Sequence, residues 1–171
     1  MKKILSAVLA LALVLSMTSV AFAATGLGSY TSVSATAAGD KNGSVSANTT
    51  MCALTLDADG KIVAVSFDVV QVKAAFDKTG AIAGEVNAEP QTKNELGEAY
   101  GMKAISSIGK EYNEQTEALA AWCVGKTVEE VLTLLASDNG YIPDDVDVKA
   151  SCTIGVSDLL KALEKAFANA K

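Results

Sequence analysis

The clearest pattern in the chain is an alternation of apolar and polar residues in two neighbouring segments, 45–56 and 62–72. A period of two residues is typical of a strand with one face in the core. An Asp-Ala-Asp-Gly turn at 57–60 separates the segments, so we expect a β-hairpin. The side chains that this phase directs into the core are Cys52, Leu54 and Leu56 in the first segment and Val63, Val65, Phe67 and Val69 in the second.

Beyond Pro90 the spacing of the apolar residues becomes helical. Thr92 and Glu95 form the pattern of a capping box, which predicts a short helix that ends at Gly101. Residues 110–124 predict a longer helix. One side of that helix would carry Tyr112, Thr116, Leu119 and Cys123.

Two more helices are expected in the last third of the chain. Thr127 and Glu130 form a second capping box, ahead of apolar residues at helical spacing, which are Val128, Val131, Leu132 and Leu135. Ser157 suits the N-cap of the last helix. The apolar face of this helix would consist of Leu159, Leu160, Leu163, Ala166 and Phe167.

Weaker signals predict further extended segments. Residues 146–155 are small and β-branched, which favours a strand or a strand-like loop, and residues 81–86 favour a short strand after the turn at 77–80. Residues 24–28 are expected to be a short lead-in. The pattern as a whole predicts an α+β fold, an antiparallel sheet of about four or five strands with helices packed on one face.

The start of the chain has the features of a secretory signal peptide. Two lysines precede an apolar run over 4–15, and Ala-Phe-Ala at 21–23 has the form of a cleavage site. We therefore expect residues 1–23 to be removed and residues 24–171 to form a single domain, secreted or held at the extracellular face of the cell envelope. The apolar run is too short to cross a membrane and no later stretch approaches about twenty apolar residues, so we expect no transmembrane anchor in the mature chain.

Charge and composition exclude several classes of function. Without Lys2 and Lys3 the chain has 12 lysines against 20 carboxylates, a net charge of −8, which argues against nucleic acid as a partner. The chain has no histidine and no arginine, which removes histidine-based triads, histidine metal sites and bidentate arginine clamps. The turn at 57–60 lacks the later ligands of a calcium loop. No set of residues supports a hydrolase with paired carboxylates, so no catalytic residue and no metal site is predicted and an enzyme is not favoured.

Three cysteines, Cys52, Cys123 and Cys152, are widely spaced and form no Cys-x-x-Cys pair. An exported protein can form disulfides, but an odd number leaves at least one thiol unpaired. We expect all three to be small buried residues, with a single disulfide as the alternative.

Several stretches resemble known exported proteins. The segment TKNELGEAYGMKAISSIGKEYNEQ at 92–115, the hairpin segment LDADGKIVAVSFD and the ending KALEKAFANAK resemble exported proteins of Gram-positive anaerobes that are grouped with FMN-binding domains. FMN-binding domains place a D-x-x-S-G-A-T motif late in the chain, and in some the threonine carries FMN covalently. Asp147 and Thr153 match that motif, but Ala150, Ser151 and Cys152 stand where S-G-A would be. Because the glycine is missing, the resemblance implies non-covalent FMN if the cofactor is present.

This resemblance singles out candidate cofactor residues. The loop that leads into the last helix would hold the phosphate, through Ser151, Cys152, Thr153, Gly155 and Ser157. The flavin ring would pack on Tyr100, Met102 and Tyr112, and the phosphate would attract Lys103 or Lys110, with Lys93 as a further lysine of the same kind. The backbone amides of Ser106, Ser107 and Gly109 are a second candidate phosphate cradle.

Each of these residues also has a purely structural interpretation. Thr153 would be an ordinary strand residue, the serines would start a helix, the aromatic and methionine side chains would belong to the core, and the lysines would cover a solvated helix. We therefore carry two hypotheses. The first is an extracytoplasmic FMN-binding-like module that carries electrons to or from a membrane or cell-surface redox partner, and the second is a cofactor-free structural or binding protein of the cell surface.

Overall fold

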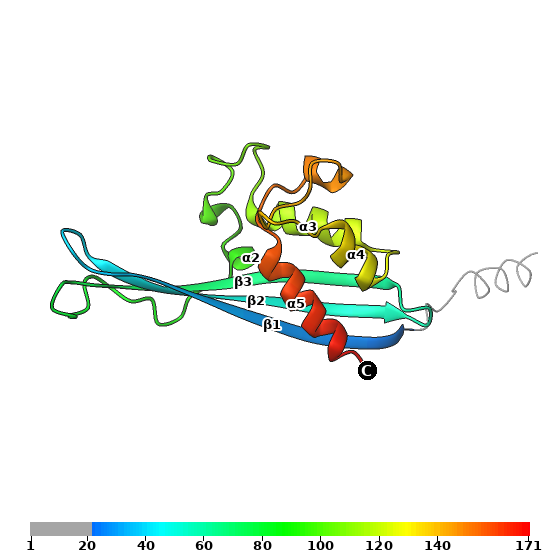
Figure 1. The fold of residues 1–171 in the computed structure, drawn as a ribbon, viewed down its shortest axis with the longest axis horizontal. Helices are drawn as coiled ribbons and strands as arrows, with labels where there is room; N and C mark the ends of the chain where they lie inside the picture. Colours follow the sequence, from blue (N-terminus) through cyan, green and yellow to red (C-terminus); the bar gives the residue numbers. More distant parts are fainter. Residues whose placement is uncertain (1–21) are drawn as a thin grey trace, which may run out of the picture.

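A computed structural model describes residues 22–171 of the chain, with side chains from Ala24 onward. The predicted signal peptide therefore lies almost entirely outside the described residues. The chain builds one antiparallel sheet in the order β1-β2-β3, from β1 (Phe22–Thr36), β2 (Gly43–Asp57) and β3 (Ile62–Phe76) (Figure 1). The expected hairpin of β2 and β3 is confirmed, but the sheet has three strands where we expected four or five.

The helices follow the sheet in sequence. They are α2 (Lys93–Leu96), α3 (Tyr112–Cys123), α4 (Val128–Leu134) and α5 (Ser157–Ala168), with single 3₁₀ turns at η1 (Gly97–Tyr100) and η2 (Asp147–Ala150). Both predicted capping boxes are formed, at the starts of α2 and α4. Of the described helices, none combines the length and the apolar character that crossing a membrane requires.

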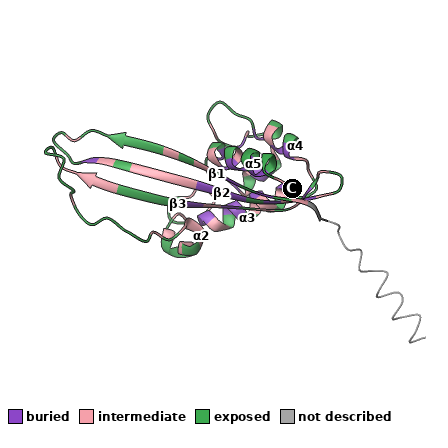
Figure 2. Cartoon of the chain, turned by 90° about the horizontal axis from the view of Figure 1, so that it is seen from below, coloured by how far each residue is buried: buried purple, intermediate pink, exposed green. Residues whose placement is uncertain are grey.

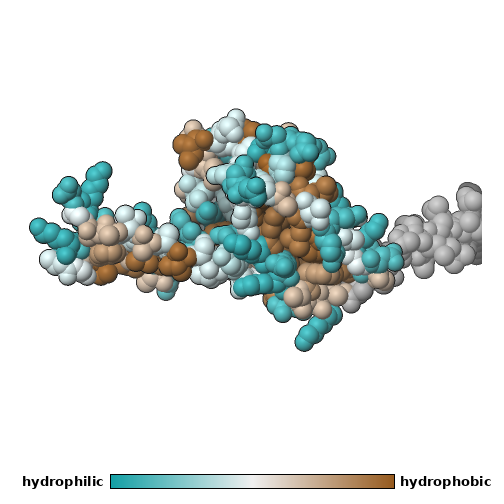
Figure 3. Space-filling view, viewed as in Figure 1, coloured by the Kyte–Doolittle hydropathy of each residue, from teal (hydrophilic) through white to brown (hydrophobic). Residues whose placement is uncertain are grey.

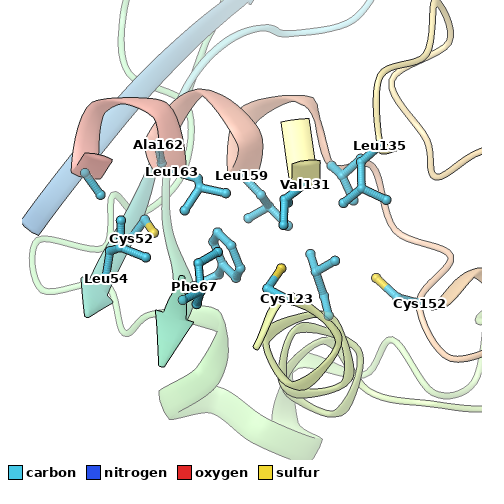
Figure 4. Close-up of a cluster of buried hydrophobic side chains, with 14 of the residues drawn as sticks. Cys52, Leu54, Phe67, Cys123, Val131, Leu135, Cys152, Leu159, Ala162 and Leu163 are labelled. Carbon is cyan, nitrogen blue, oxygen red and sulfur yellow. The ribbon is translucent and has the colours of Figure 1, made fainter. Parts of the chain in front are cut away.

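The helices lie on one face of the sheet, as predicted, and the core lies between the two layers (Figures 1 and 2). α5 packs on β1 and β2, while α3 packs on β3. The apolar side chains of the hairpin that are buried in the core are Cys52, Leu54, Leu56, Ile62, Phe67 and Val69. Figure 4 shows several of them facing Cys123 of α3 and the buried side of α5, which is formed by Leu159, Ala162, Leu163 and Ala166. Val63 and Val65 are half-buried.

β1 replaces the lead-in that we expected at 24–28. This segment contains Gly26 and Gly28, which weaken a strand in isolation. The structure explains them by a close approach, since a Cβ built on Gly26 would lie 1.9 Å from the carbonyl oxygen of Ala166 in α5. The glycines are therefore a packing requirement of α5. The predicted cleavage after Ala23 falls at the irregularity in pairing between Phe22 and Ala24.

Two of the expected strands are not formed. Residues 81–86 make only an isolated bridge between Ile82 and Phe76. Residues 146–155 contain η2 and a loop, with an isolated bridge between Gly155 and Tyr141. In both cases the β-type composition gives a single isolated bridge, and no ladder of paired residues forms.

The sheet is longer than its helical layer. Each strand has 15 residues, about 50 Å of extended chain, and the halves distant from the termini extend beyond the helices (Figure 1). We name this extension the arm and define it as residues 31–36, 43–49 and 70–76. Most arm residues are exposed or half-buried (Figure 2), and hydrophilic residues gather at its tip (Figure 3).

All three cysteines are buried and unpaired, as expected. Burial raises the pKa of the Cys52 and Cys123 thiols to about 12 and that of the Cys152 thiol to about 11. Such thiols are protonated at neutral pH and behave as small apolar side chains.

Candidate functional site

A cavity of about 470 Å³ lies where the base of the arm meets the helical layer. Seven of the candidate cofactor residues line it, and they come from separate segments of the chain. These residues are Lys93, Met102, Ser106, Ser107, Tyr112, Thr153 and Gly155. The other lining residues that matter for its chemistry are Thr50, Ile105, Gln115, Tyr141, Asp158 and Leu159.

Gln115 holds two walls of this cavity together. Its side chain is completely buried on the inner side of α3. Its Oε1 accepts hydrogen bonds from the amide (2.8 Å) and the hydroxyl (3.2 Å) of Thr153, while its Nε2 donates to the carbonyl of Lys110 (3.1 Å) and to Ser106 Oγ (3.3 Å). The carboxamide therefore fixes the loop before α5 against the loop before α3, and it uses both its donor and its acceptor capacity.

Glu111 fixes the chain beneath the cavity. The residue is only 4% exposed, and its carboxylate accepts hydrogen bonds from the amides of Met102 (2.8 Å) and Lys103 (2.9 Å). These two bonds satisfy a buried negative charge with backbone donors. They also close the 102–111 segment into a loop and thereby place Met102 in the cavity wall.

Lys93 supplies the positive charge of the cavity. Its Nζ lies 4.6 Å from the ring centroid of Tyr112 and 5.0 Å from that of Tyr100, and the two rings meet edge to face at 5.8 Å. Cation–π contacts of this kind hold an ammonium group in place. Burial, and then the nearby Asp68 carboxylate, raise the pKa of Tyr112 above its ordinary value, so this phenol stays neutral.

The lining also contains a carboxylate. Asp158, in the first turn of α5, accepts a hydrogen bond from Ser32 (2.9 Å) and forms an ion pair with Lys161 (3.6 Å). The cavity therefore has a positively charged residue on one wall, a negatively charged residue on another, and apolar side chains such as Ile105 and Leu159 between them.

The remaining predicted residues do not line the cavity. Cys152 is fully buried in the core, and Tyr100 contributes only through its contact with Tyr112. Lys103 and Lys110 belong to the loop that Glu111 and Gln115 hold, and their side chains are not among the lining residues. Ser151 is also outside the lining.

Ser157 was predicted as the N-cap of α5, and this prediction is wrong. The N-cap is Val156, whose amide donates to the carbonyl of Gly140 (2.8 Å). Ser157 is the first helical residue, and its hydroxyl packs against Gly140, where a Cβ would lie 2.5 Å from Ser157 Oγ. The hydrogen bond to Gly140 fixes Val156 as the N-cap, so the helix begins one residue earlier than it would with Ser157 as the cap.

Asp147 and Thr153, the two residues that match the flavinylation motif, are both engaged in the protein's own contacts. Asp147 accepts a hydrogen bond from Trp122 Nε1 (2.6 Å), which ties η2 to the end of α3. Thr153 is tied to Gln115. Ser151, in the place of the motif glycine, has φ −118°, so this position does not need a glycine.

Sequence reasoning missed Gln115, Glu111 and Asp158. The signal for Gln115 is present in the sequence, because Gln115 shares the buried face of α3 with Tyr112 and Leu119, three and four residues away. A polar side chain on the buried face of a helix needs hydrogen-bond partners inside the protein. Glu111 and Asp158 carry no comparable signal, since acidic residues near a helix start are common.

Comparison with known proteins gives one partial similarity. The chain is similar to a chlorophenol reductase of Desulfitobacterium hafniense, with 39% identity over 95 residues. The matched region covers 49% of this chain and 29% of that protein, so the chain spans less than a third of the length of this relative. No protein-family model matches the chain, and no solved structure matches it.

Proposed function

We propose that this protein is an extracytoplasmic FMN-binding module that carries electrons and holds its cofactor non-covalently in the cavity beside Gln115. The observation that carries the proposal is the convergence of Met102, Tyr112, Thr153 and Gly155 on one cavity, since the resemblance to FMN-binding domains had singled them out. The volume of about 470 Å³ lies within the range of about 300–1,000 Å³ of small-molecule sites.

The lining residues fit the two parts of FMN. The flavin ring needs apolar and aromatic walls, which Met102, Ile105 and Tyr112 supply. The phosphate dianion needs a cation, and Lys93 is the lysine in the lining. Because Asp158 would repel an anion, the phosphate would be directed toward Lys93.

The same residues argue against covalent attachment. The hydroxyl of Thr153 donates a hydrogen bond to Gln115 Oε1, and a carboxamide oxygen cannot act as a general base of useful strength. The role that remains for Thr153 is to orient the wall of the cavity. Gln115 holds it in that position.

A bound flavin would supply one- and two-electron transfer. The chain's own residues would bind and orient the ring and limit its contact with water. The similarity to a protein named chlorophenol reductase supports a redox role, as does the expected export, which would bring the module close to a redox partner in the membrane or at the cell surface.

The experiment is a titration of residues 24–171 with FMN, followed by quenching of flavin fluorescence. Lys93→Met should weaken FMN binding by about tenfold to a hundredfold, because one charge-assisted contact contributes about 1.5–3 kcal/mol. The matched variant Lys103→Met should bind FMN as the unmodified chain does, since Lys103 is outside the lining. Riboflavin, which lacks the phosphate, should bind both lysine variants equally.

No quenching at about 100 μM FMN, roughly a hundredfold above a micromolar dissociation constant, would contradict the proposal. The cofactor-free surface protein would then be the better hypothesis. Equal weakening by Lys93→Met and Lys103→Met would retain FMN but move its phosphate away from the cavity described above.

A further inference from the structure

The two outer edges of the sheet, on β1 and on β3, differ in how far other segments of the chain cover them. Along β3 the outer edge is covered at intervals: Ile62 receives a hydrogen bond from Gly125 and donates one to Lys126, and isolated bridges join Val70 to Thr92 and Phe76 to Ile82. Asn94 also donates a side-chain hydrogen bond to the carbonyl of Phe67 (2.8 Å). These contacts obstruct the approach of another strand along this edge.

Along β1 the outer edge is covered only near the termini. Thr25 exchanges two backbone hydrogen bonds with Lys171 (3.0 and 3.1 Å), Asn169 Nδ2 donates to the carbonyl of Leu27 (3.0 Å), and Lys165 Nζ donates to that of Ser29 (3.0 Å). All three strand residues are odd-numbered, so the odd-numbered residues of β1 direct their amides and carbonyls away from β2.

The same phase leaves three positions of β1 open within residues 22–171. They are Thr31, Val33 and Ala35, whose outward amides and carbonyls have no backbone or side-chain partner among the described residues. The open part of the strand lacks the residues that usually protect an edge, since Phe22–Thr36 contains no charged residue and no proline. Gly26 and Gly28 face α5, so the side chains of the odd-numbered open positions lie on the face opposite the helices.

That face of the arm is a small apolar grid. Cross-strand pairing aligns Val33, Ala47 and Val72 in one row, Ala35, Val45 and Ala74 in the next, and Thr31, Thr49 and Val70 in the third. Val33 is 68% exposed, Val45 40% and Val72 39%. None of these nine residues is charged.

We propose that two copies of this chain pair through β1 at the arm, antiparallel and about a two-fold axis at Val33, to form a continuous six-stranded sheet. Pairing centred on Val33 places Val33 opposite its symmetry mate and Thr31 opposite Ala35 of the other copy. Each of these three pairs exchanges two backbone hydrogen bonds, about six in all. A two-fold interface uses the same residues from both copies.

The chemistry of this edge favours a second copy of the chain as the partner. Each chain carries a net charge of −6 over its full length, but β1 itself has no charged residue. Two copies of β1 can therefore pair without placing like charges opposite each other. The open stretch 31–35 is symmetric about Val33, so this register uses every open backbone group. Pairing also joins the two apolar grids into one surface, with the two Val33 side chains as cross-strand neighbours.

The test is the oligomeric state of residues 24–171, measured by sedimentation and light scattering. The mass should rise from that of one chain to that of two as the concentration increases. Val33→Pro should abolish the dimer, because it removes an outward amide and leaves the bonds to β2 intact. Val72→Lys, in the same row but on β3, should remain dimeric.

Cross-linking tests the register directly. The chain's own cysteines are buried, so Val33→Cys introduces one exposed thiol that should lie about 5.5 Å, Cα to Cα, from its symmetry mate, within the range of a disulfide. Oxidation should therefore yield a covalent dimer. Leu27→Cys is the matched control, because Leu27 is on the same strand and face and is 73% exposed, yet its mate would lie about 40 Å away.

A chain that stays monomeric at every concentration overturns the proposal. So does a Val33→Pro variant that remains dimeric, or equal cross-linking of the two cysteine variants. Loss of the dimer in Val72→Lys would assign the interface to the apolar face and would also overturn pairing through the edge. Circular dichroism confirms that each variant is folded.

Discussion

Gly28 of β1 lies so close to Ala162 of α5 that a Cβ built on the glycine would be 2.1 Å from the Ala162 carbonyl oxygen. The obstacle is helix backbone, which cannot rotate aside as a flexible side chain can. The spacing between the sheet and α5 is therefore determined by a residue without a side chain.

Gly28→Ala should consequently destabilise the fold. We expect the free energy of unfolding to fall by about 1–3 kcal/mol, the usual cost of overpacking, because α5 must move away from β1. Denaturant unfolding followed by the fluorescence of the single tryptophan measures this. Gly39→Ala is the control, since a Cβ at Gly39 meets nothing within 4 Å, and a similar loss in that variant would contradict the explanation.

Phe67→Ala tests the phase of β3. Phe67 is 2% exposed in the centre of the core, so its truncation should lower the free energy of unfolding by about 3–5 kcal/mol. Its neighbour Ser66 is on the exposed face, and Ser66→Thr should change stability by no more than about 0.5 kcal/mol. Denaturant melts that gave the reverse order would place the strand out of register by one residue.

Gln115→Leu should loosen the cavity as well as the fold. Leucine keeps most of the volume but leaves the amide of Thr153 and the carbonyl of Lys110 without a partner. We expect a loss of about 1–3 kcal/mol in unfolding free energy, together with faster hydrogen exchange at Thr153. Gln71→Leu, at an exposed site on β3, should have little effect; unchanged exchange at Thr153 in the Gln115 variant would show that the tie is unimportant.

The burial of the three cysteines predicts how their thiols react and how the stability of the fold depends on pH. With pKa values of about 12, 12 and 11, Cys52, Cys123 and Cys152 should react with a thiol reagent only after unfolding, and then all three should react. The unfolded chain loses the thiol protons near the ordinary pKa of 9.0, whereas the folded chain keeps them until the pH approaches about 12. The free energy of unfolding should therefore be unaffected by these groups below about pH 9 and should fall as the pH rises toward 12. Rapid modification of any thiol in the native protein would contradict the burial.

The sequence predicted the elements whose signals are local. The hairpin follows from alternation around a turn, and α2 and α4 follow from capping boxes, all of which involve residues close together in the chain. β1 could not be predicted in the same way, because Gly26 and Gly28 are explained by contacts with α5 at the other end of the chain. The strand count was wrong for a related reason, since 81–86 and 146–155 reach only isolated bridges.

The candidate site was predicted only in part. Residue type was enough to select Met102, Tyr112, Thr153 and Gly155, which line the cavity. It was not enough to choose among the lysines, because Glu111 and Gln115 determine the path of the loop that carries Lys103 and Lys110, and these contacts join residues several positions apart. Whether the cavity binds FMN remains the prediction that the titration addresses.

The hydrogen bonds between Thr25 and Lys171 bring the two ends of the described fold together, while the tip of the arm lies at the far end of the sheet (Figure 1). A short linker could therefore join these two ends with little strain. New termini placed in the turn at 37–42 would then give a circularly permuted chain whose ends lie at the tip of the arm. For the same reason, anything attached at either end would occupy the same pole of the molecule. The arm would point away from such an attachment.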